Sequence, residues 1–99
     1  MVTFINKLTV NGDIAEFLKI KESLTEFMSA QPGYRSSATL RQVGRPDVFI
    51  EMAEWDNAAA HQAAVRSEEF QARVKGLGAL ASVEPGLYEV VTEDGANRG

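Results

Sequence analysis

The eight residues from Val48 to Trp55 constrain the fold most, because they form a strand pattern with few polar positions on either side. Successive side chains of a strand point to opposite faces. One face therefore carries Phe49, Glu51, Ala53 and Trp55, and the other carries Val48, Ile50, Met52 and Glu54. Both faces are mainly apolar, which predicts a strand covered on both sides. A carboxylate in such a strand must be hydrogen-bonded, paired with a cation or protonated, since a bare buried charge is very costly.

The chain of 99 residues predicts a single domain, which we place at residues 1–92, followed by a polar tail at 93–99. A chain this short buries a smaller fraction of its surface than a longer one. A cavity weakens it further unless a second subunit covers part of its surface. We therefore expect a homodimer.

Alternating and helical patterns follow each other along the chain in the order strand, helix, strand, strand, helix, helix, strand. Asp13, Asp56 or Asn57, and Ser67 are candidate helix caps, while Pro32 and Gly33 end the first helix. Pro85 suggests that the last strand lies at an edge or contains a bulge. The expected strands are 2–10, 34–41, 48–55 and 83–91, and the expected helices are 13–30, 57–66 and 67–75.

This order predicts an α+β fold, a ferredoxin-like βαββααβ sandwich with helices on one face of a four-stranded antiparallel sheet. The other sheet face has no cover within the chain. Its apolar candidates are Ile5, Val48, Ile50 and Met52. Two sheets packed across a dimer would bury them.

Composition excludes several classes of function. The net charge is −4 with no basic cluster, so no nucleic-acid partner is expected. The chain has no cysteine and lacks phosphate-binding loops, dinucleotide fingerprints and metal-ligand spacings, so we expect neither cofactor nor metal. No signal peptide or membrane-spanning run is evident, which predicts a cytoplasmic protein without a membrane partner.

Asn6 interrupts an otherwise apolar face of the first strand. An unpaired buried amide costs about 1 to 3 kcal/mol, so its hydrogen bonds must be met by a neighbouring backbone group or by a ligand. Glu51 also has two interpretations. It is either a group that takes part in chemistry inside a cavity or the partner of Lys7, Arg35 or Arg41 in a salt bridge.

Trp55 is either a large core residue at the end of a strand or part of a site. His61 lies in an alanine-rich helix with no second histidine in the chain and no cysteine. We expect a surface histidine, or one whose hydrogen bonds are satisfied within the helix, in preference to a metal ligand.

Four segments together resemble the antibiotic biosynthesis monooxygenase superfamily: Val2–Lys7, Phe27–Tyr34, Glu51–Trp55 and Ser67–Phe70. The likeness extends to about Val91. Within that superfamily the chain is most similar to the cofactor-independent oxygenases that convert anthrones to anthraquinones in aromatic polyketide pathways. The resemblance implies a dimeric α+β barrel with a substrate cavity between sheet and helices.

The resemblance also implies site residues. The strand-one asparagine of those oxygenases matches Asn6, and their strand-three tryptophan matches Trp55. Their strand-three asparagine falls on Glu51, so a carboxylate replaces an amide. A related branch degrades haem, but its helix tryptophan falls near Ala64 and its histidine near Arg73, which disfavours haem degradation.

These observations give the hypothesis of a cofactor-free monooxygenase in which Asn6, Glu51 and Trp55 act on an aromatic polyketide and dioxygen. An apolar pocket would suit Glu51 as a general base, and the Asn6 amide could stabilise an oxyanion. The expected substrate-binding residues are Leu24, Phe27, Phe70 and Leu80. The alternative is a non-oxidative polyketide cyclase or isomerase, or a ligand-binding dimer without turnover.

Overall fold

The computed structural model describes residues 1–95 of the chain. Its elements are β1 (Val2–Val10), α1 (Ile14–Ser29), β2 (Tyr34–Gln42), β3 (Arg45–Trp55), α2 (Ala58–Arg66), α3 (Glu68–Val74), a 3₁₀ turn (Leu77–Ala79) and β4 (Ala81–Tyr88). The strands form one antiparallel sheet in the order β2-β3-β1-β4. The predicted α+β ferredoxin-like fold is confirmed.

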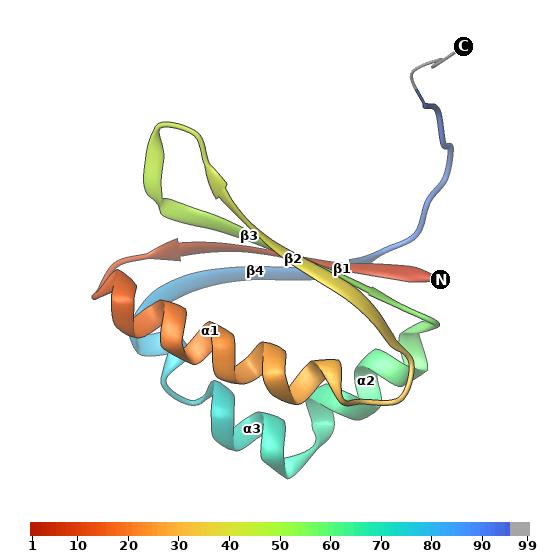
Figure 1. Ribbon diagram of the computed structural model, residues 1–99, viewed down its shortest axis with the longest axis horizontal. Coiled ribbons are helices and arrows are strands. Elements are labelled where there is room, and N and C mark those ends of the chain that lie inside the picture. The colour runs from red at the N-terminus through yellow and green to blue at the C-terminus, as the bar shows by residue number, and fades with distance from the viewer. Residues whose placement is uncertain (96–99) are drawn as a thin grey trace.

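All three α-helices lie on one face of the sheet, and the β2–β3 hairpin extends past them (Figure 1). The core between the layers is centred on Leu8, Phe17 and Phe49, which are almost completely buried. No helix within residues 1–95 combines the length and the apolar character that crossing a bilayer requires.

The helices begin where local hydrogen-bond chemistry predicts. Asp13 accepts the backbone N–H of Glu16 at 3.0 Å, and Ser67 accepts that of Phe70 at 3.2 Å. For α2 the cap is Asn57, which accepts the N–H of Ala60 at 2.8 Å. Each cap satisfies a donor that the first helical turn leaves free.

Gly33 holds the turn between α1 and β2 against the start of α2. Its φ of +88° is a backbone conformation that residues other than glycine rarely adopt. A Cβ there would lie 2.5 Å from that of Ala60, and the Gly33 carbonyl accepts the N–H of Asp56 at 2.8 Å. This turn therefore fixes Tyr34 next to the end of β3.

One edge strand departs from regular alternation, and the other confirms the edge position predicted from Pro85. In β2, Tyr34 pairs with Trp55 and Ser36 with Glu54, so Arg35 is an extra residue that forms a bulge. Beyond the bulge Ser37 and Thr39, not Ser36, share the face of Tyr34. In β4, Pro85 does lie at an edge, but the pairing with β1 runs without a register shift from Ala81 to Tyr88.

The predicted tail at residues 93–99 lies partly outside the described residues, which end at 95. The last strand ends at Tyr88, three residues before the predicted end.

Candidate functional site

A cavity of about 100 Å³ lies between the sheet and the helices. Its walls are mainly apolar and aromatic, with contributions from Phe4, Leu8, Leu24, Met28, Val65 and Phe70. Its polar lining comes from Asn6, Lys21, Thr25, Tyr34, Ser37, Glu51 and His61. A mostly apolar pocket with a few converging polar groups is the usual form of a small-molecule site.

Strand register brings Asn6 and Glu51 together on the cavity wall. The two residues are direct partners in the β1–β3 ladder, and their side chains point to the helix-covered face. Trp55 lies on the same face of β3, four residues further along. The three residues singled out in the sequence thus line one cavity.

Asn6 is oriented by the neighbouring edge strand. Its Oδ1 accepts the backbone N–H of Glu84 at 3.0 Å, next to the β4 position that faces Asn6, where Pro85 has no N–H. Because the carbonyl oxygen is engaged in that bond, the NH2 group is the part of the amide that can donate to a ligand.

Glu51 forms a charged cluster with residues from two other elements. Its Oε1 pairs with the ammonium group of Lys21 on α1 and accepts the hydroxyl of Thr39 on β2 at 2.7 Å. The Lys21 and Glu51 side chains are only 9% and 12% exposed. The carboxylate therefore faces the cavity, but in an ionic environment and not the apolar one expected.

The three predicted ion-pair partners of Glu51 are wrong. Lys7 lies on the opposite face of β1, Arg35 pairs with Asp56 at 2.8 Å, and the Arg41 guanidinium stacks 4.9 Å from the centre of the Phe49 ring. Lys21 was missed because its contact with Glu51 joins a helix to a strand 30 residues later in the chain. Its only sequence signal is its position in the apolar stripe of α1, three residues before Leu24.

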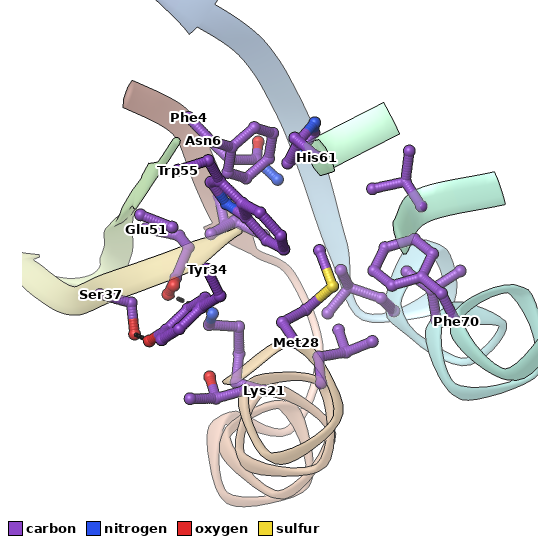
Figure 2. A pocket seen from close by; sticks show the side chains of 17 residues that line it. Phe4, Asn6, Lys21, Met28, Tyr34, Ser37, Glu51, Trp55, His61 and Phe70 are labelled. Carbon is purple, nitrogen blue, oxygen red and sulfur yellow. Dashed lines mark hydrogen bonds and ion pairs between the residues drawn. The ribbon is translucent and has the colours of Figure 1, made fainter. Parts of the chain in front are cut away.

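Trp55 is completely buried between two other rings. Tyr34 meets it edge-on at 5.5 Å and His61 at 5.4 Å. His61 also stacks on Phe4 at 4.8 Å. Figure 2 shows Phe4, Asn6, Trp55 and His61 at one end of the pocket, with Lys21, Glu51, Tyr34 and Ser37 at the other.

His61 is neither a surface residue nor a satisfied one, contrary to the sequence expectation. It is 6% exposed, and within residues 1–95 neither Nδ1 nor Nε2 has a hydrogen-bond partner. Burial lowers the pKa of the imidazole, which favours its neutral form. The missed signal was helical spacing, because His61 and Ala64 lie three residues apart and are the buried residues of α2.

The Trp55 indole N–H also lacks a partner in the described part of the chain. An unsatisfied buried polar group costs about 1 to 3 kcal/mol. Trp55 and His61 therefore form a cluster of unused hydrogen-bonding groups in the cavity wall, and a ligand could use them.

The four predicted substrate-binding residues divide into two pairs. Leu24 and Phe70 line the cavity. Phe27 instead packs between α1 and α3, with its ring 6.5 Å from that of Phe70 and 5.6 Å from the Arg73 guanidinium. Leu80 packs on the core beside Gly12, at the other end of the sheet. The sequence pattern identified apolar positions but did not distinguish those that line the cavity from those that pack elsewhere.

Comparisons with known proteins agree with the fold. The sequence model of the family described as antibiotic biosynthesis monooxygenase matches residues 1–76. Deoxynogalonate monooxygenase of Streptomyces nogalater is 31% identical over 87 residues, which cover 88% of this chain and 74% of that enzyme.

The crystal structure of SnoaB, a cofactor-independent oxygenase from Streptomyces nogalater, superposes with a TM-score of 0.88 at 29% identity. The match covers 93% of this chain and 94% of SnoaB. A conserved protein from Methanosarcina mazei has the same fold, with a TM-score of 0.81 at 19% identity over 88% of this chain and 89% of its own.

Proposed function

The chain belongs to the antibiotic biosynthesis monooxygenase family, and from this premise we propose that it is a cofactor-independent monooxygenase that oxidises an anthrone-like aromatic polyketide intermediate to a quinone. Its likeness to named oxygenases makes it an oxidoreductase. In the proposed reaction a ring CH2 group becomes a carbonyl. One oxygen atom of dioxygen enters the product, and the other leaves as water with the two hydrogens of the CH2 group.

The observation that carries this proposal is the position of Asn6 and Trp55 on the wall of an apolar, aromatic cavity. Phenolic tricyclic compounds are flat and apolar with a few polar edges, which matches such a lining. The anion of such a compound is electron-rich enough to reduce dioxygen without help. The protein then has to ionise the substrate, orient it and exclude water.

The polar residues divide this work. The Asn6 NH2 group donates to the oxyanion of the ionised substrate, and Trp55 stacks on its rings or positions dioxygen. Glu51 uses Oε1 for Lys21 and Thr39, so Oε2 remains for a substrate hydroxyl. The Lys21 ammonium beside it favours a phenolate.

Oxygen uptake with dithranol, a dihydroxyanthrone, tests the proposal after subtraction of the enzyme-free rate. Trp55→Phe and Glu51→Gln should each lower the enzymatic rate by about 10-fold or more while the circular dichroism spectrum is retained. Glu54→Gln is the matched control, because Glu54 lies on the same strand but on the other face. Absence of enzymatic uptake with dithranol and with other anthrones contradicts the proposal.

A non-oxidative cyclase or isomerase is the rival, and the carboxylate of Glu51 in the cavity is the observation that favours it. The two functions separate under anaerobic conditions. An oxygenase releases no product without dioxygen, whereas a cyclase or isomerase turns over at its full rate. A pure binding protein returns the ligand unchanged in both atmospheres.

We also propose that two copies pair through the sheet face that bears no helix (Figure 1). Ile5, Ile50 and Met52 are half-buried on that face, and Leu40 is 48% exposed. A second sheet would cover this apolar band. In sedimentation velocity the wild type should be a dimer and Met52→Glu a monomer. Val43→Glu, at the hairpin tip, should remain a dimer, and a monomeric wild type would contradict the pairing.

A further inference from the structure

The two ends of the cavity differ in whether their polar groups are already engaged. Glu51 has a counter-ion and a hydroxyl donor at Oε1. The imidazole of His61 has neither, although it is more than nine-tenths buried and lines the same cavity. A neutral imidazole carries one N–H donor and one lone pair. Neither is used by any group in the described residues.

The ring of His61 is held in place by apolar contacts only. It stacks on Phe4 at 4.8 Å and meets the edge of Trp55 at 5.4 Å. Rotation about the Cβ–Cγ bond exchanges the positions of ring nitrogens and carbons within this slot, so either nitrogen can face a ligand. The Trp55 N–H beside it can donate to an oxygen of the same ligand.

We infer that His61 is the proton acceptor of the reaction and that Glu51, with Lys21, positions a substrate hydroxyl. The inference rests on the proposed oxygenase function. His61 takes a proton from the CH2 group of the substrate and becomes imidazolium, and the resulting carbanion reduces dioxygen and combines with it to give a peroxide anion. The imidazolium protonates that anion. The imidazole then removes the second C–H proton as the O–O bond breaks, and the departing hydroxide takes that proton to form water.

Burial supports this role, because it lowers the pKa of His61 and keeps the imidazole unprotonated at neutral pH. The other ionisable groups on the cavity wall come from three elements: Lys21 on α1, Tyr34 on β2 and Glu51 on β3. Lys21 and Glu51 pair with each other, and the Tyr34 hydroxyl donates to Ser37 at 2.6 Å. Met28, Phe4 and Trp55 complete the surroundings with uncharged side chains.

The first experiment follows the ionisation step separately from the oxygen step. Under anaerobic conditions, wild-type protein mixed with dithranol should produce the absorbance of the dithranol anion, and His61→Gln should produce it about 100-fold more slowly or worse. With dioxygen, His61→Gln should lower kcat by a similar factor, change KM by only a few fold, and lose the acid limb of the pH profile of kcat/KM. Gln62→Ala, on the exposed side of α2, should behave as wild type.

The second experiment uses the unaltered protein and therefore does not depend on the variant folding. His61 is the only histidine in the chain, so the imidazole nitrogens give one set of ¹⁵N signals in tag-free protein. They should show a neutral ring in the free protein and an imidazolium ring in the anaerobic complex with dithranol. Unchanged nitrogen signals on formation of the anion overturn the inference.

The outcomes separate this inference from the proposed function. If the wild type forms the anion through His61 but consumes no oxygen, the oxygenase proposal fails and the role of His61 stands. If the wild type consumes oxygen and His61→Gln matches it in rate and pH profile, the role of His61 fails and the oxygenase proposal stands. If the wild type forms no anion, both the ionisation mechanism and the role of His61 are overturned.

Discussion

The charged end of the cavity and the aromatic end represent two different uses of buried polar groups. At the charged end, Lys21, Glu51 and Thr39 satisfy one another across α1, β3 and β2. At the aromatic end, Trp55 and His61 are packed as tightly but leave three nitrogen atoms without partners in residues 1–95. Removing one partner from the first arrangement leaves a buried charge unpaired and costs stability. The second arrangement already costs stability and leaves groups for a ligand. Mutations at the two ends should therefore have opposite effects on the free energy of unfolding.

Lys21→Met should give the largest loss of stability. Removing the ammonium leaves the Glu51 carboxylate in the cavity without its counter-ion, and breaking a buried pair in this way costs about 3 to 5 kcal/mol. Urea denaturation measures the difference. The double variant with Glu51→Leu should recover part of the loss, and a single variant as stable as wild type would show that the charged end does not hold the layers together.

The stability of the wild type should depend on pH through His61. Because burial lowers the folded-state pKa of this imidazole, the unfolded chain binds more protons below about pH 6.5. Stability should therefore fall as the pH decreases from that value, by at most about 1.4 kcal/mol per pH unit from this group. The measurement is the difference between wild type and His61→Phe across pH 7 to 5, which removes the shared contribution of the carboxylates.

His61→Phe should change the free energy of unfolding at neutral pH only slightly, without the loss expected for Lys21→Met. A phenyl ring preserves the stack on Phe4 and removes two unsatisfied nitrogens, so the change should be neutral or stabilising by about 1 kcal/mol. Thermal denaturation monitored by circular dichroism provides the value. A loss as large as that of Lys21→Met would mean that the two ends of the cavity do not differ in this respect.

Arg35→Gln should give the smallest change in the free energy of unfolding. Its pair with Asp56 has the same charges as the Lys21–Glu51 pair, but both side chains are more than half exposed. Exposed pairs contribute about 0 to 1 kcal/mol. In urea denaturation, the loss of unfolding free energy for Arg35→Gln should therefore be smaller than that for Lys21→Met by at least about 2 kcal/mol. Equal losses would show that burial is not what distinguishes the two pairs.

The fold could be predicted from the sequence because its determinants are local. Alternation identified Val2–Val10, and short-range caps located the starts of α1 and α3 at Asp13 and Ser67. The positions of Asn6, Glu51 and Trp55 on one wall follow from strand alternation and from the pairing of β1 with β3.

The rest of the site could not be predicted because it depends on contacts between distant elements. The partner of Glu51 is set by the packing of α1 on the sheet, which no local pattern specifies. His61 lies in a helix composed mainly of alanines, and because alanine is common on both buried and exposed helix faces, helical spacing did not identify which face was buried. Phe27 and Leu80 have the same apolar character as Leu24 and Phe70. Only the three-dimensional packing shows that the last two line the cavity and the first two do not.

Because of the bulge at Arg35, the side chains that face the cavity depend on the number of residues in β2 as well as on their identity. Tyr34 shares the inner face with Ser37 and Thr39 only because one extra residue separates them. Deleting Arg35 would restore regular alternation and require either Tyr34 or the strand beyond it to change faces. A deletion of one codon could thus change the side chains that line the cavity in a single step, giving a set that no point substitution would produce.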